Sequence, residues 1–378
     1  MNQPISPPPP RITVLDALRG FALGGIFLVN IMVMSKPGGF TDGPAHSLVN
    51  ALFYDKFYVL FSFLFGYSLT MQFRSAARAR VSPTARTVRR CSMLMAIGLL
   101  HIAFLFTGDV LFGYGVAGLA LLALSRLRSK TALIVAAVPF TVSLIAITVM
   151  NVLHVDLSMT ATQQETALAA IRSGWLDAAS YRWNVFAGNA YAFLMFGLLN
   201  ALPMFVIGMV AGKARLLEQP ERYLPLLPRV QWIGFTVATP ICVLAAVTDW
   251  PLAGPAHLVA PLLSAAYAAT ILRLLHHNST VQQVFAPAGK IAATNYIGQS
   301  LIAAVIFTGY GFALAGKLSE WAVLGIAVVV YAAQLAVSAW YVRRHRYGPI
   351  EWVLRAATYG TLRPGRSKPR GRHAASTG

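Results

Sequence analysis

Long apolar segments recur along the chain, and they restrict its possible folds more than any other feature. At about 1.5 Å per helical residue, segments of roughly 20 residues cross a hydrocarbon core about 30 Å thick. The sequence therefore predicts an all-α polytopic membrane protein, a bundle of about ten transmembrane helices. The predicted spans are residues 14–34, 55–73, 91–107, 110–125, 131–153, 189–211, 230–247, 257–275, 291–312 and 321–342.

Composition supports a membrane location for the chain. Of 378 residues, 57% are hydrophobic and only 11% are charged. This is too little polar surface for a soluble protein of this length. The net charge of +19 could suggest nucleic acid as a partner, but most basic residues flank apolar spans. That distribution is typical of membrane topology, so we expect the lipid bilayer, and no nucleic acid, as a partner.

The basic residues also predict the orientation of the bundle. Ten spans put 26 of the 31 Lys and Arg on the side that carries both termini. The five on the other side are Lys36, Lys56, Arg172, Arg182 and Lys317. The positive-inside rule then predicts cytoplasmic termini in a multi-pass protein of the bacterial inner (plasma) membrane.

Three regions of different character make up the predicted domain plan. Residues 1–10 end in four prolines, and residues 361–378 form a basic tail; both are expected to be disordered. Residues 11–360 form a single transmembrane domain. Within it lie an N-terminal block (11–126), an outer loop (about 154–188) with at least one surface helix, and a C-terminal block (about 200–360).

The first span contains an acid, a base and an amide. Asp16 and Arg19 lie three residues apart and can pair, and Asn30 returns to nearly the same helix face. One interpretation is that Asp16 and Arg19 lie at the cytoplasmic interface and Asn30 among the outer headgroups. The other is a functional stripe that faces a cavity and binds a substrate or donor.

His101 and Asp109 are the predicted catalytic pair. His101 lies inside the third span and Asp109 just beyond its end. An imidazole oriented by a carboxylate can take a proton from a hydroxyl or amine. Eight helical residues extend about 12 Å, so direct contact requires the hairpin to fold Asp109 back. The alternative is structural: His101 bonds a neighbouring span and Asp109 caps the next helix.

Two amides and two thiols are further candidates for substrate or metal binding. Asn295 and Gln299 lie four apart in the ninth span, where they either join helices or line a cavity. Cys91 and Cys242 have no metal-type or disulfide-type neighbours, so we expect two inert thiols and no metal site.

An amphipathic cytoplasmic helix is predicted after the last span. Gly348 and Pro349 favour a helix start, and Glu351 and Arg355 can pair at i,i+4. The helix either anchors the topology or presents its arginines to a phosphate-bearing ligand.

Five sequence blocks together resemble one family. They are LDALRGFALGGIFLVNI (15–31), FSFLFGY (61–67), LLHIAFLFTGDVLFGYGVAGL (99–119), GKIAATNYIGQSLI (289–302) and GPIEWVLRAATY (348–359). In this order they resemble the YeiB-like bacterial membrane proteins, which carry domain of unknown function 418. The resemblance covers nearly all of residues 11–360. The opening block is also similar to that of the wider transmembrane acyltransferases.

The wider resemblance implies transfer of an acyl group from a cytoplasmic thioester to an envelope-side hydroxyl or amine. By this resemblance Arg19 matches the arginine of the opening motif, and His101 with Asp109 the histidine and acid of the family hairpin. His46, in the first outer loop, is a rival histidine by position.

The expected partners follow from that chemistry. Acyl-CoA is the expected co-substrate, a saccharide or lipid-linked molecule the acceptor, and no cofactor is bound; the oligomeric state stays open. The alternatives are a transporter or flippase for a small polar or lipid-linked solute, and a non-catalytic membrane scaffold. The enzymatic hypothesis expects the polar residues of distant spans to share one interior pocket.

Overall fold

The computed structural model describes residues 13–38, 43–155 and 158–360, so the predicted disordered ends lie outside the described residues. In those ranges all regular structure is helical. The α-helices are α1 (Thr13–Ser35), α2 (Pro44–Leu52), α3 (Lys56–Arg78), α4 (Pro83–Phe104), α5 (Leu111–Leu124), α6 (Ser129–Val152), α7 (Ala161–Arg172), α8 (Trp175–Gly188), α9 (Ala190–Phe196), α10 (Leu202–Lys213), α11 (Leu227–Ile233), α12 (Thr239–Val247), α13 (Ala253–His277), α14 (Ser279–Lys290), α15 (Ala292–Phe307), α16 (Glu320–Arg344) and α17 (Pro349–Tyr359).

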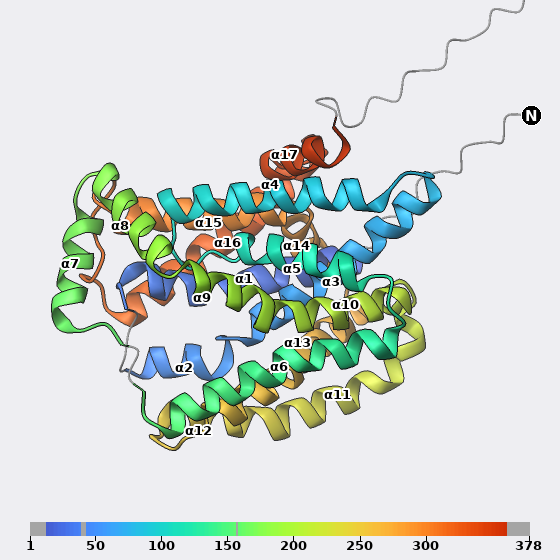
Figure 1. Cartoon of the computed structure of the whole chain (residues 1–378), viewed down its shortest axis with the longest axis horizontal. Helices are drawn as coiled ribbons and strands as arrows, with labels where there is room; N and C mark the ends of the chain where they lie inside the picture. Colours follow the sequence, from blue (N-terminus) through green and yellow to red (C-terminus); the bar gives the residue numbers. More distant parts are fainter. Residues whose placement is uncertain (1–12, 39–42, 156–157, 361–378) are drawn as a thin grey trace, which may run out of the picture.

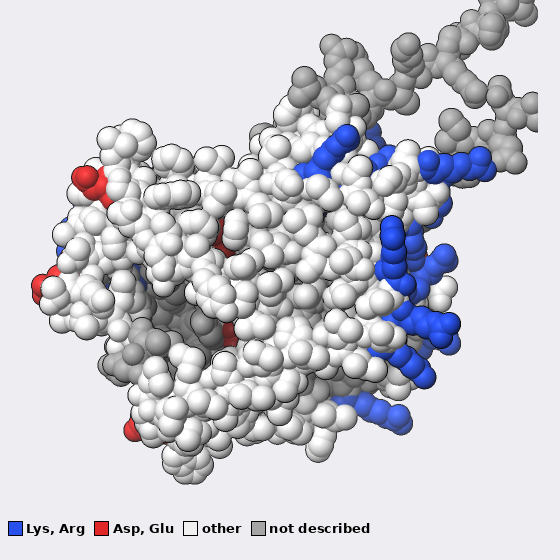
Figure 2. Space-filling model, viewed as in Figure 1, with Lys and Arg blue, Asp and Glu red and all other residues white. Residues whose placement is uncertain are grey.

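The helices are those of a multi-pass membrane protein. Within the described residues, 8 helical segments are long and apolar enough to cross a membrane, and the bent pair α14–α15 raises the number to 9. The shorter apolar helix α5 corresponds to the fourth predicted span. An all-helical bundle with membrane-spanning helices is thus confirmed, while the total of about ten and the cytoplasmic termini stay predictions. Figure 2 shows Lys and Arg gathered at one end of the molecule, as that orientation requires.

Helix α1 lies at the centre of the bundle (Figure 1). Within its most apolar stretch 67% of the residues are buried, against 11% for α6 and 17% for α16. The outer helices instead expose large aliphatic side chains, such as Ile134 and Val329, each 69% exposed. In a bilayer these faces contact lipid, and α1 is surrounded by protein.

Glycines allow the central helices to touch backbone to backbone. A methyl group added at Gly289 of α14 would overlap the carbonyl oxygen of Asp16 in α1, and one at Gly20 would overlap that of Phe285. Gly66 of α3 and Gly208 of α10 form a second crossing of this kind. Small residues at such crossings are the usual means by which membrane helices gain van der Waals contact.

Prolines explain two irregular turns within the spans. The π-helical turns Gly197–Ala201 and Gly234–Ala238 come just before Pro203 and Pro240. A proline lacks an N–H group, and its ring clashes with the preceding turn, so the helix widens there. The break that the sequence predicted near Asn200 lies in the first of these turns.

Two helices extend beyond the predicted spans. Helix α4 begins at Pro83, eight residues before the predicted 91–107, because the basic residues there continue the helix beyond the apolar stretch. Residues 279–290 lie between the eighth and ninth predicted spans. They form α14, which meets α15 at an angle of 78°. Its small residues pack on α1.

Candidate functional site

The hairpin between α4 and α5 brings His101 and Asp109 together. Nδ1 of His101 lies 2.9 Å from Oδ1 of Asp109, and both side chains are fully buried. The chain leaves the helix after Phe104 and folds back, and the other carboxylate oxygen accepts a hydrogen bond from the Phe112 amide (2.7 Å). The carboxylate thus caps α5 and faces the imidazole. Both ring nitrogens of His101 are buried, and neither makes a hydrogen bond of regular geometry among the described residues.

Side chains from two other helices border the imidazole. The ring of Tyr296, on α15, lies 5.1 Å from that of His101. Its hydroxyl accepts a hydrogen bond from the Val110 amide (3.4 Å) and bonds the side chain of Asn30 on α1. The structure therefore joins Asn30, His101 and Asp109 through Tyr296, a residue that the sequence analysis did not select. We refer to these four residues as the hairpin site.

Asp16 and Arg19 form a separate group. Nη1 of Arg19 donates to Oδ1 of Asp16 (2.9 Å), and Nη2 donates to the hydroxyl of Ser68 on α3. Arg19 precedes Asn30 by 11 residues on α1, or about 16 Å of helix. The pair therefore lies well away from the hairpin site and joins α1 to α3.

The amides of α15 join three helices. Nδ2 of Asn295 donates to the carbonyl of Ala288 (3.0 Å) in α14 and to Ser338 (2.9 Å) in α16. Gln299 donates to the side-chain oxygen of Gln334 (2.7 Å). The bend between α14 and α15 frees a carbonyl that a straight helix would have paired, and Asn295 satisfies it. The arrangement is the helix-joining one of the two alternatives.

The terminal helix α17 begins at Pro349, where the sequence predicted a helix start. The predicted ion pair between Glu351 and Arg355 is absent from the contacts of the described residues, because Glu351 faces α15. It accepts hydrogen bonds from the amides of Ala293 (2.7 Å) and Thr294 (3.2 Å) and from the Thr294 hydroxyl (2.6 Å). Glu351 thus caps the amino end of α15, where negative charge is favourable. Arg355 lies over two aromatic rings instead.

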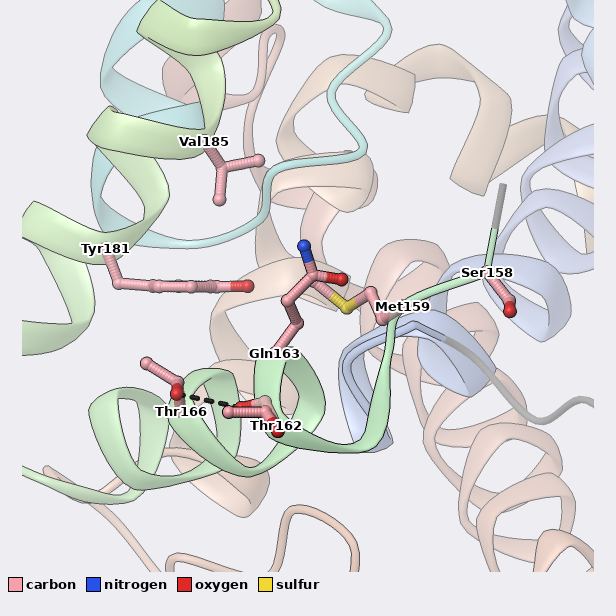
Figure 3. A pocket seen from close by; sticks show the side chains of 7 residues that line it. All are labelled: Ser158, Met159, Thr162, Gln163, Thr166, Tyr181 and Val185. Atoms are coloured by element: carbon pink, nitrogen blue, oxygen red, sulfur yellow. Dashed lines mark hydrogen bonds between the residues drawn. The ribbon is translucent and has the colours of Figure 1, made fainter. Parts of the chain in front are cut away.

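The outer loop folds over the hairpin as helices α7 and α8. Arg182 of α8 donates to the carbonyl of Phe104 (3.1 Å), the last residue of α4. A cavity of about 550 Å³ lies between these helices, with Gln163 and Tyr181 on its wall (Figure 3). Burial raises the pKa of Tyr181, which keeps its phenol neutral. The cavity has both polar and apolar lining residues and lies at the same end of the molecule as the hairpin.

Two other candidates from the sequence have structural contacts. The amide of His46, in α2, donates to Glu320 (3.0 Å), so its backbone helps fix α2 to α16. Cys91 and Cys242 are buried free thiols. Among the described residues, no group of three or more His, Cys, Asp and Glu side chains could hold a metal ion.

Comparison with known proteins finds relatives along nearly the whole chain. Residues 211–361 match the family described as "Protein of unknown function (DUF418)". The sequence is 31% identical over 386 positions to "Uncharacterized protein YxaH" of Bacillus subtilis, covering 94% of this chain and 96% of that protein. The chain belongs to the DUF418 family. This DUF418 protein is also 25% identical over 393 positions to "Uncharacterized protein YeiB" of Escherichia coli, covering 95% and 99% of the two chains. The predicted family is thereby confirmed.

This DUF418 protein has a second His–Asp pair, which was not predicted from its sequence. Asp55, between α2 and α3, lies 3.3 Å from Nδ1 of His257 on α13. Its side chain is 32% exposed, and Nε2 of His257 is buried with no hydrogen-bond partner among the described residues. Asp55 has a φ of 65°, an uncommon conformation for a residue other than glycine.

A signal for this pair was present in the sequence. Asp55 and His257 were each the first residue of a predicted span, both at the outer side. Their shared predicted depth in the membrane indicates that Asp55 and His257 could be partners, although 202 positions separate them.

Proposed function

We propose that this protein is an acyltransferase of the bacterial inner membrane. The observation that supports this proposal most strongly is the hairpin site: a fully buried imidazole 2.9 Å from a buried carboxylate, with neither ring nitrogen in a hydrogen bond among the described residues. A buried polar atom without a partner is costly in an apolar bundle, so its retention favours a role toward a bound substrate. The donor is acyl-CoA, and the acceptor is a saccharide or lipid-linked molecule with a hydroxyl or amine.

In this proposal the hairpin site alone carries the chemistry, because Arg19 and the amides of α15 have their own partners elsewhere. His101 acts as a general base. Nε2 takes the proton of the acceptor hydroxyl or amine while that atom attacks the thioester carbonyl. A bond from the acceptor atom to the acyl carbon forms, the carbon–sulfur bond breaks, and the thiolate leaves with the proton from the imidazolium. Asp109 positions the ring, and its charge favours the imidazolium that forms. Tyr296 and Asn30 supply polar groups beside the reacting atoms.

Labelling with radioactive acyl-CoA tests this proposal. The purified protein is incubated with the labelled donor and an extract of envelope lipids and saccharides. We expect His101→Ala to lower acceptor labelling by at least about 100-fold, the usual contribution of a general base. His154→Ala, which removes an exposed histidine of the outer loop, is the matched control. Undiminished labelling in His101→Ala would remove this residue from the mechanism.

A transporter or flippase is the second candidate, because of the bend between α14 and α15. Broken helices whose ends meet within the bundle are a common feature of substrate sites in transporters. If the protein is a transporter or flippase, solute should enter proteoliposomes without any acyl donor. A scaffold, in contrast, expects alanine at Asp16, Arg19, His101 or Asn295 to change stability alone.

A further inference from the structure

Four arginines gather where α17 packs on α4. Arg86 and Arg90 belong to α4, Arg355 to α17, and Arg346 to the turn before α17. We call these four residues the α17 cluster. Figure 2 shows basic side chains concentrated toward this end of the molecule. Like charges repel one another, so such a group requires compensation.

Aromatic rings separate the cations of the α17 cluster. The guanidinium carbon of Arg355 lies 4.9 Å from the centre of the Tyr347 ring and 4.7 Å from that of Tyr359. Arg86 lies 4.8 Å from the same Tyr359 ring, and Arg346 lies 5.3 Å from that of Tyr347. The rings hold the guanidinium groups in place by cation–π contact, but they supply no hydrogen-bond acceptor in the guanidinium plane.

The nearby acid does not balance these charges. Glu351 is the acidic side chain whose charge acts on Arg90. Its two oxygens already accept three hydrogen bonds from α15. The Nε atoms of Arg90 and Arg355 are buried, and neither has a hydrogen-bond partner in the described part of the chain. Both side chains are half-buried, and a buried Nε donor without an acceptor is unfavourable, so the two arginines favour an anionic partner.

A mainly apolar pocket adjoins the cluster. It has a volume of about 450 Å³, and its walls include Arg346, Tyr347, Trp352 and Val353. The ring of Tyr347 thus borders the pocket on one side and Arg355 on the other. A ligand with both a phosphate and an apolar part would match this juxtaposition.

We propose that the α17 cluster binds a phosphate group, with Arg90 and Arg355 as its principal donors. Guanidinium groups match the geometry of phosphate oxygens, and a bound phosphate group supplies acceptors for the two Nε donors. The phosphate belongs either to a coenzyme A thioester or to the headgroup of an anionic phospholipid. The first source rests on the proposed acyltransferase function; phosphate binding itself does not.

Binding measurements on the purified full chain test the site. Coenzyme A is titrated calorimetrically, and binding to phosphatidylglycerol vesicles is compared with binding to phosphatidylcholine vesicles. The variant Arg90→Gln with Arg355→Gln is expected to weaken binding of the preferred probe at least tenfold. The matched control is Arg222→Gln with Arg229→Gln, which removes two exposed arginines and is expected to change affinity less than twofold.

Each outcome bears on the proposal. Binding of coenzyme A identifies the thioester as the source, and selective binding of phosphatidylglycerol identifies the lipid. No binding of either probe, or an equal loss in both double variants, would overturn the site. If the double variant does not fold, Arg355→Lys replaces it, because lysine keeps the charge and loses the planar fork; affinity equal to that of the unchanged protein then overturns the proposal.

Experiments can contradict phosphate binding at the α17 cluster without contradicting the proposed acyltransferase function, and the reverse. Coenzyme A binding that persists in a protein without transfer activity would contradict the proposed function alone. Transfer that persists in a protein whose α17 cluster binds no phosphate would contradict this site alone.

Discussion

At the scale of residues, most polar side chains in the membrane region have a local partner. Asn295 satisfies a carbonyl freed by the bend, Glu351 caps α15, and Arg19 joins α1 to α3. Such groups stabilise the bundle because hydrocarbon offers them no alternative partner. His101 differs from these three residues, since neither of its ring nitrogens makes a hydrogen bond among the described residues. His257, Arg90 and Arg355 also have a buried nitrogen without such a bond, so the distinguishing feature of His101 is the complete burial of both the imidazole and its carboxylate.

Removal of Glu351 should destabilise the protein. Glu351→Ala leaves the first amides of α15 and the Thr294 hydroxyl without their acceptor. Hydrogen bonds to a charged group contribute about 1.5–3 kcal/mol each, but Glu351 is half-buried and water can replace part of what is lost, so we expect a total loss of roughly 2–3 kcal/mol. The midpoint of thermal unfolding in detergent measures it. Glu221→Ala, at an exposed acid, is the control, and equal midpoints for the two variants would contradict the capping role.

The sequence predicted some of these residue roles and missed others for physical reasons. His101 and Asp109 lie in one hairpin, so their proximity could be anticipated from their spacing. Tyr296 reaches the same place from α15, 186 positions from Val110, and no local pattern reports such a contact. The Asp55–His257 pair was missed for the same reason, because its two residues are 202 positions apart in the sequence. The predicted single pocket is divided: Arg19 and the amides of α15 have their own partners, away from the imidazole.

At the scale of elements, hydropathy predicts the long apolar helices well, including the buried α1, whose range Thr13–Ser35 matches the predicted 14–34. Helices α6 and α16 agree closely with their predicted ranges, because their exposed faces must be apolar. Helix α14 contacts protein along α1, so its polar sequence resembled a loop. The angle of 78° between α14 and α15 depends on tertiary contacts, which a window of sequence does not contain.

The crossing of α1 and α14 should be intolerant of side-chain growth. In Gly289→Ala the new methyl group would overlap the backbone of Asp16, so the two helices must separate. Overpacking of this kind costs about 1–3 kcal/mol. The fraction of protein that remains monodisperse after heating in detergent measures the effect.

Gly325→Ala is the matched control for this crossing. No atom lies within 4 Å of the position that its methyl group would take, and alanine favours a helix over glycine. We expect unchanged or slightly higher stability. If the two alanine variants behave alike, the close approach of α1 and α14 is not required.

At the scale of the whole molecule, charge is distributed unequally between the two ends. Lys and Arg concentrate at one end, and most visible Asp and Glu lie toward the other (Figure 2). The positive-inside rule assigns the basic end, with α17, to the cytoplasm.

Reporter fusions test this orientation. A green fluorescent protein fused after residue 378 should be fluorescent, and alkaline phosphatase fused there should be inactive. Phosphatase fused after Trp250, in the predicted outer turn, should be active. The opposite pattern of activities would invert the bundle and place the α17 cluster outside the cell.

The cap on α15 also bears on how the chain is made. Glu351 follows Thr294 by 57 positions, and α16 is inserted between them. Until the ribosome has synthesised residue 351, the amides at the amino end of α15 lack this acceptor. The helix that carries Tyr296 is therefore capped only after nearly the whole polypeptide has been synthesised. A product terminated before residue 351 would contain every predicted span but would lack the carboxylate that caps α15.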